Sequence, residues 1–238
     1  AMILIVRRGR GRAPPRRAQS TPMNLLAPLP PGWSELLRTA LEVAATLAFA
    51  LSGVIAAARQ RLDVVGVCVV AFAAAFGGGT LRDLLLDQRP FFWVRHIEFV
   101  WALLALCLAA MALMRQRELA LTERAILWPD AIGLGLFTAI GVDLGLAVGL
   151  PALAAVMMGV ITSCFGGVLR DVLCNLLPSA FSDHRPYALW SFAGGWLHVG
   201  LLAAGLPPWL VLTVTVLFTA GMRLVSVWRG WSLPGWRV

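Results

Sequence analysis

The 238-residue sequence contains no lysine, and only 13% of its residues are charged. A chain without lysine cannot form a P-loop, and the HExxH and GxSxG signatures of metalloproteases and serine hydrolases are also missing. The four cysteines (Cys68, Cys107, Cys164 and Cys174) show no CxxC spacing, which favours small apolar packing residues over a metal or redox site. We therefore predict a protein that is not an enzyme, with no catalytic residues, no metal site and no cofactor.

Apolar residues make up 59% of the chain, more than a soluble core of this size needs. Tryptophans lie at several ends of the long apolar runs, where their amphipathic rings prefer the headgroup level. The sequence thus predicts an all-α membrane protein with seven transmembrane helices, at about 36–58, 62–86, 97–114, 126–148, 151–175, 188–206 and 208–228.

The net charge of +8 comes mainly from the N-terminus, because six of the twenty arginines lie within residues 7–17. From residue 23 onward the chain has 14 arginines and 12 acidic residues, a net charge of +2, so the charge gives no reason to expect nucleic-acid binding. We expect residues 1–32 to be a disordered basic arm, either an extension ahead of a start at Met23 or a contact for anionic lipids. The arm lacks the apolar segment and cleavage site of a signal peptide. Residues 231–238 are predicted to be a C-terminal tail.

Arginines also predict the orientation, since cytoplasmic loops of membrane proteins are enriched in basic residues. With the tail and the two motif arginines left out, one predicted side receives only Arg38, Arg89 and Arg95. The other side receives nine: Arg59, Arg61, Arg115, Arg117, Arg124, Arg185, Arg223, Arg229 and Arg237. We therefore expect the C-terminus in the cytoplasm and the N-terminus outside.

An internal repeat organises the membrane domain, residues 33–230. Shifting the chain by 88 residues aligns 46–96 with 134–184 without a gap and gives twelve identities in 51 positions, most of them around FGGGTLRDLLLDQRP (76–90) and CFGGVLRDVLCNLLP (164–178). Each copy contains three predicted spans, at about 36–114 and 126–206, and an odd number of spans inverts the second copy in the membrane. The span at 208–228 is then an addition.

The glycines of the repeated motif predict a bend or break in the second and fifth spans, although close helix packing explains glycines equally well. Buried Arg-Asp pairs are costly in a membrane, so they indicate either a polar pathway or anchors at the interface. Adjacent helical residues do not face each other, so we expect Arg82 not to neutralise Asp83 directly. Asp83 and Asp87 share a helical face at i,i+4, as do Asp171 and Asn175, which makes Asp87 and Asn175 further pore-lining candidates.

Four other polar residues give weaker indications. Glu42 and Asp143 are each compatible with a pathway or with a helix end, and we keep Asp143 as a pore-lining candidate. His96 and His184 repeat with the motif at span entrances, which favours interface anchoring. His198 is alone on an apolar helix, so we expect a hydrogen-bonded packing residue.

At these residues the sequence resembles the prokaryotic branch of the trimeric intracellular cation (TRIC) channel family, over about residues 33–230. The resemblance rests on the seven spans, the inverted triplets, and GGGTLRD paired with GGVLRD. It implies a homotrimer in the prokaryotic inner membrane, with membrane lipids as partners. A bound lipid is compatible with this, but the sequence does not identify one. Each protomer would pass monovalent cations, mainly K⁺ and also Na⁺, between bent spans 2 and 5. The implied pathway residues are Gly77, Gly78, Gly79, Arg82, Asp83, Gly166, Gly167, Arg170 and Asp171.

The mode of transport stays open at this point, because an inverted repeat with broken helices suits channels and carriers alike. Some bacterial relatives of the resembled family are thought to carry small amino acids such as glycine, so a secondary transporter is the main alternative. A lipid-handling or purely structural membrane protein is the third.

Overall fold

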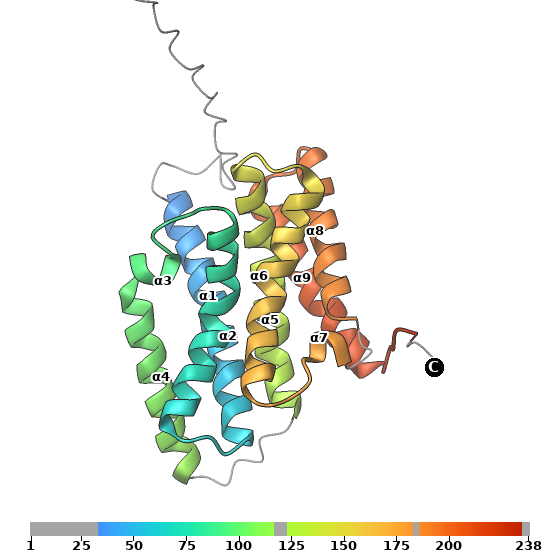
Figure 1. The fold of residues 1–238 in the computed structure, drawn as a ribbon. Coiled ribbons are helices and arrows are strands. Elements are labelled where there is room, and N and C mark those ends of the chain that lie inside the picture. Colours follow the sequence, from blue (N-terminus) through green and yellow to red (C-terminus); the bar gives the residue numbers. More distant parts are fainter. Residues whose placement is uncertain (1–32, 117–122, 183–185, 235–238) are drawn as a thin grey trace, which may run out of the picture.

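The computed structural model describes residues 33–116, 123–182 and 186–234, so the basic arm (1–32), His184, Arg185 and the end of the C-terminal tail lie outside it. All regular structure in these described ranges is helical (Figure 1). The helices are α1 (Trp33–Arg59), α2 (Val64–Leu85), α3 (Phe92–Arg95), α4 (Ile97–Gln116), α5 (Glu123–Ala147), α6 (Ala152–Leu173), α7 (Ser179–Ser182), α8 (Ala188–Ala203) and α9 (Pro208–Trp228).

Each predicted span falls on one of the seven longer helices. Five of these, α1, α2, α5, α6 and α9, are long and apolar enough to cross a bilayer. The apolar parts of α4 and α8 are shorter, at Ile97–Leu113 and Ala188–Ala203. The all-α membrane class is thus confirmed, whereas the count of seven spans stays a prediction. The sequence did not predict α3 and α7, two four-residue helices that follow the two copies of the motif.

The helices α2 and α6 end in the same way, 88 residues apart. The amide of Gln88 donates to the carbonyl of Asp83, and that of Leu176 donates to the carbonyl of Asp171, both at 2.8 Å. Asp87 (φ 50°) and Asn175 (φ 55°) occupy the left-handed conformation that such a helix end requires. Asp and Asn adopt this conformation more readily than other residues with a side chain, which explains why they follow both helices.

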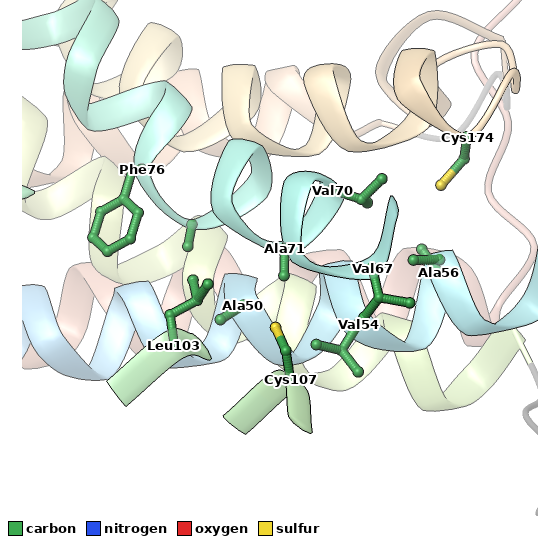
Figure 2. Close-up of a cluster of buried hydrophobic side chains, with 12 residues drawn as sticks. Ala50, Val54, Ala56, Val67, Val70, Ala71, Phe76, Leu103, Cys107 and Cys174 are labelled. Atoms are coloured by element: carbon green, nitrogen blue, oxygen red, sulfur yellow. The ribbon is translucent and has the colours of Figure 1, made fainter. Parts of the chain in front are cut away.

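The centre of the bundle is α5, which packs against α1, α6, α8 and α9. Beside it, small and branched side chains of α1, α2 and α4 form an apolar cluster, in which Ala50 and Ala71 allow α1 and α2 to lie close together (Figure 2). Cys107 belongs to this cluster and Cys164 to another, as expected for small apolar packing residues.

Residues that the 88-residue shift pairs also contact one another. Phe49 stacks on Phe137 with 5.6 Å between ring centroids. A Cβ atom on Gly78 would collide with the carbonyl oxygen of Thr162, and one on Gly166 would collide with that of Ala74, the residue equivalent to Thr162. Such reciprocal contacts are typical of two units that pack around an approximate two-fold axis.

The two motifs lie at opposite ends of the bundle. In Figure 1, α2 ends near α3 at the upper end, whereas α6 ends near α7 at the lower end. We refer to these as the α3 end and the α7 end. Helix α1 begins at the α3 end, and α9 finishes at the α7 end (Figure 1).

Candidate functional site

Arg82 is buried in the last turn of α2, where it binds the carboxylate of the next residue. Its Nε and Nη2 donate to Asp83 Oδ1 at 2.9 and 2.7 Å, and Nη2 lies 3.7 Å from Glu42 Oε1 of α1. The expectation that Arg82 and Asp83 do not neutralise each other is therefore wrong. The guanidinium reaches the carboxylate of the following residue because the arginine side chain is long and flexible. The rule that adjacent helical residues do not face each other concerns only the directions in which side chains leave the helix.

Arg170 occupies the equivalent position at the end of α6. Its Nε donates to Asp171 Oδ1 at 2.8 Å, and its Nη1 donates to Asp130 Oδ1 of α5 at 2.5 Å. Nη1 also donates to Ser52 Oγ of α1. Three helices thus meet at this guanidinium, and Arg170 as a whole is only 3% exposed.

We name the two groups the first cluster (Glu42, Arg82 and Asp83) and the second cluster (Asp130, Arg170 and Asp171). Glu42 and Asp130 are also 88 residues apart, so each copy of the repeat supplies one arginine and two carboxylates. Sequence reasoning missed Asp130, because it lies outside the segment that aligned by identities. Extending the 88-residue alignment by four residues toward the N-terminus, and counting Glu and Asp as equivalent, would have paired Asp130 with Glu42.

The motif aspartates also hold the two short helices. Asp83 Oδ2 accepts the amide of Phe92, the first residue of α3, at 3.1 Å. Asp171 Oδ2 accepts the amide of Ser179, the first residue of α7, at 2.9 Å. Each carboxylate therefore binds its arginine with one oxygen and an otherwise unpaired helix N-terminus with the other.

The motif glycines separate into two groups. Gly78 and Gly166 lie where α2 crosses α6, each against a backbone carbonyl of the other helix, and Gly77 lies against the side chain of Leu169. Gly79 and Gly167 instead lie beside the guanidinium groups. A Cβ added to Gly79 would lie 3.9 Å from Arg82 Nη2, and one added to Gly167 would lie 3.8 Å from Arg170 Nη2. The predicted break is not observed, since α2 and α6 are helical through all of these glycines.

Asp87 and Asn175 do not share a helical face with the motif aspartates. The helices end at Leu85 and Leu173, and the left-handed residues turn the chain away. Both residues are exposed, and Asp87 Oδ1 lies 4.0 Å from Nε of Arg89. The i,i+4 argument is therefore wrong here, because it assumed one more helical turn.

A cavity of about 550 Å³ opens at the α3 end, next to the first cluster. Its walls carry both signs of charge, from Glu42, Asp83, Arg82 and Arg95 together with His96. A smaller pocket beside it reaches Gly79 and Thr80 of α2. Arg82 Nη1 is buried and has no hydrogen-bond acceptor within the described ranges, so the two N–H groups of this nitrogen are left for a ligand or solvent.

The remaining candidates lie elsewhere. Asp143 is buried on α5, where its Oδ1 lies 4.0 Å from Nε2 of His198 on α8 rather than in either arginine cluster. His96 Nδ1 lies 3.0 Å from Glu98 Oε1, and His198 is fully buried, as expected of a packing residue.

Comparison with known proteins gives consistent matches. A family model described as "Glycine transporter" matches residues 39–115 and again residues 127–203, each bound of the second match lying 88 residues after that of the first. A UPF0126 membrane protein of Vibrio cholerae is 37% identical over 198 residues, which cover 82% of this chain and 80% of the relative. The UPF0126 inner membrane protein YadS of Escherichia coli is 38% identical over 159 residues, 66% of this chain and 75% of its own.

Among solved structures, a trimeric intracellular cation channel orthologue from Rhodobacter sphaeroides superposes with a TM-score of 0.76 at 30% identity. The match covers 82% of this chain and 99% of that one. The structural likeness therefore extends over most of this chain and nearly all of the relative.

Proposed function

This chain belongs to the TRIC/UPF0126 family of multi-pass membrane proteins, and from that membership we propose that it conducts monovalent cations, mainly K⁺ and also Na⁺. The proposed pathway runs inside each protomer between α2 and α6, from the α3 end to the α7 end. We assign to it the nine motif residues named from the sequence, together with Glu42 of the first cluster and Asp130 of the second.

The observation that carries this proposal is the pair of buried arginine–carboxylate clusters at opposite ends of one helix crossing. Each cluster holds one guanidinium and two carboxylates, an excess of one negative charge when all are ionised. A fixed negative charge at each end of a narrow polar route concentrates cations there. The arginine holds the carboxylates together, so its release would open the route.

We also propose seven spans and two inverted copies of a three-helix unit. The reciprocal contacts of Phe49 with Phe137 and of Gly78 with Gly166 support this arrangement, as does the family model that matches twice. The proposed orientation has the α3 end outside and the α7 end in the cytoplasm, supported by the nine-to-three arginine count. A cytoplasm-specific reporter fused to Val238 checks it, and a reporter active only outside would contradict it.

A carrier of a small amino acid is the second candidate. The description of the matching family favours it, and so does the cavity at the α3 end, whose walls offer carboxylates and a guanidinium to a zwitterion. Unitary K⁺ currents that reverse near the K⁺ equilibrium potential identify a channel, whereas saturable glycine uptake without unitary currents identifies a carrier.

The test of the cation pathway is Asp83→Asn in planar bilayers. The single amide oxygen can still accept from either the Phe92 amide or the Arg82 guanidinium, so the variant removes a charge and one of these two sets of hydrogen bonds. The melting temperature in detergent is therefore measured beside the conductance. We expect cation conductance to fall at least about fivefold, since unit charges a few Å apart interact by about 1 to 4 kcal/mol. Higher salt should shrink the effect through screening.

Asp87→Asn is the matched control, because it removes the same charge four residues away at an exposed position where the second copy already has Asn175. Its conductance should equal that of the unsubstituted protein. Equal conductance in both variants, with protein levels intact, would reduce the clusters to structural anchors.

A further inference from the structure

Outside the two clusters, a buried polar group with two ionisable side chains connects α5, α8 and α9. His198 of α8 is fully buried, Thr215 of α9 is fully buried beside it, and Asp143 of α5 is 7% exposed. His198 Nδ1 lies 3.2 Å from Thr215 Oγ1, and His198 Nε2 lies 4.0 Å from Asp143 Oδ1.

The hydrogen bonds around Thr215 indicate which nitrogen of His198 carries a proton. The Thr215 hydroxyl donates its one proton to the carbonyl of Val211, at 2.8 Å. With that proton used, we assign the contact with His198 as an Nδ1–H donating to Thr215 Oγ1. In a neutral imidazole this leaves Nε2 as a bare acceptor, and Nε2 has no hydrogen-bond partner in the described part of the chain.

Two acceptors therefore face each other inside the bundle, the Nε2 lone pair and Asp143 Oδ1. A buried acceptor without a donor is unfavourable, and one facing a carboxylate is more so. One added proton changes this. It makes either an imidazolium beside a carboxylate or a carboxylic acid that donates to Nε2, and a small side-chain shift then closes the 4.0 Å gap to a hydrogen bond.

We propose that Asp143 and His198 form a proton-binding site between α5, α8 and α9. The pair holds one proton between Nε2 and the carboxylate, and it carries one net negative charge when that proton leaves. The proton is the ligand, and the binding groups come from two different helices. Thr215 is the positioning residue that fixes the imidazole tautomer.

The other charged groups on the helices packed against α8 lie at its opposite end. Arg223 of α9 lies over the ring of Tyr187, at the start of α8, with 4.8 Å from its Cζ to the ring centroid. Cys164 of α6 packs against the same Tyr187. Asp130 of α5 and Arg170 of α6 lie near Gly167, as does the Tyr187 hydroxyl. Arg170 also binds Asp171. In the part of the chain that the structure describes, Asp143 is thus the ionisable group that faces His198.

The proton site adjoins the cavity at the α3 end. Leu144, the residue after Asp143, lines that cavity, as does Ala147 one turn further along α5. If the proposed cation pathway passes through this cavity, loss of the proton adds a negative charge beside it. Cation flux should then rise as the pH rises and fall as the pH falls, by roughly two- to fivefold for one screened unit charge.

The site itself is tested without any assumption about transport, by ¹⁵N NMR of the full chain with His96→Gln and His184→Gln, which leave His198 as the one histidine. We expect Nδ1 to stay protonated while Nε2 gains a proton or a strong hydrogen bond between about pH 8 and about pH 5. Asp143→Asn should move that change to lower pH. Three results would overturn the proposal. The neutral imidazole could carry its proton on Nε2, Nε2 could stay unprotonated and without a hydrogen bond over the whole pH range, or Asp143→Asn could leave the titration of His198 unchanged.

Flux measurement then tests the coupling to the pathway. Asp143→Asn and His198→Gln should flatten the pH dependence of K⁺ flux into vesicles, whereas His96→Gln, which removes the histidine of the cavity wall, should keep it. If His96→Gln alone loses the pH dependence, that dependence belongs to the histidine of the cavity wall, and the proposed coupling of the Asp143–His198 pair to cation flux is overturned. A protein whose NMR titration matches but which passes no K⁺ refutes the proposed channel and leaves the proton site standing.

Discussion

At the scale of the residue, the second cluster shows how a buried guanidinium can be held from three helices. Arg170 binds Asp171 on its own helix, Asp130 on α5 and Ser52 on α1. Arg82, its equivalent, makes its closest contacts with Asp83 alone and reaches Glu42 at 3.7 Å. The two ends of the proposed pathway are thus chemically alike, but the α7 end is closed by shorter contacts.

This difference predicts unequal effects of two equivalent substitutions. Asp130→Asn should lower the free energy of unfolding by about 1–3 kcal/mol, because it weakens a buried hydrogen bond between charged partners. Glu42→Gln should cost less, because its contact with Arg82 is longer. Thermal unfolding in detergent measures both variants, and a larger loss in Glu42→Gln would contradict the geometry.

At the scale of the element, α2 and α6 approach each other closely because both are glycine where they cross. A Cβ on Gly78 would overlap the carbonyl of Thr162, which belongs to a rigid helix backbone and cannot move aside. One residue further, a Cβ on Gly79 would have only Arg82 Nη2 within 4 Å, at 3.9 Å. Adjacent glycines of the same helix therefore have different roles.

Alanine substitutions separate these roles. Gly78→Ala should destabilise the fold by about 1–3 kcal/mol through overpacking. Gly79→Ala should be neutral or stabilising by up to about 1 kcal/mol, since alanine favours helix over glycine. Melting temperatures in detergent check the order, and two equally stable variants would mean that the crossing has room to relax. Gly166→Ala should be destabilising for the same reason as Gly78→Ala, because its Cβ would overlap the carbonyl oxygen of Ala74. Gly167→Ala is not equivalent to Gly79→Ala, because its Cβ would lie 3.1 Å from the Tyr187 hydroxyl.

At the scale of the whole molecule, the bundle presents many large apolar side chains on its outside, among them Trp101 of α4 and Leu217 of α9, both 68% exposed. In a membrane such surfaces face lipid or another protein. On α8 and α9, Gly200 and Gly221 have nothing within 4 Å of an added Cβ. Small residues on an outer helical face let a neighbouring helix approach closely.

We expect this chain to assemble as a homotrimer, because the solved relative from Rhodobacter sphaeroides is an orthologue of the trimeric intracellular cation channels. Native mass spectrometry from a mild detergent should give three chain masses, with or without bound lipid. Cross-linking in the native membrane is the control for dissociation by detergent. Monomers and dimers alone in both experiments would refute the trimer.

The sequence by itself determined the membrane class, the approximate place of each long helix, the 88-residue duplication and the family. These features are local or periodic along the chain: the length of an apolar run is set by the bilayer, and a repeat is visible wherever identities persist. The Arg-Asp motif was also found from the sequence alone, because paired charges inside apolar runs need a reason to be there.

The tertiary structure decided how those residues are used. It joined Asp130 to Arg170 and Glu42 to Arg82, placed Asp143 opposite His198, and divided the glycines between a helix crossing and the guanidinium groups. It also ended α2 two residues before Asp87, which removed that residue from the motif face. Contacts between helices depend on their relative rotation and depth, and a sequence pattern gives the exposed face of each helix but not the residue that it meets on the next.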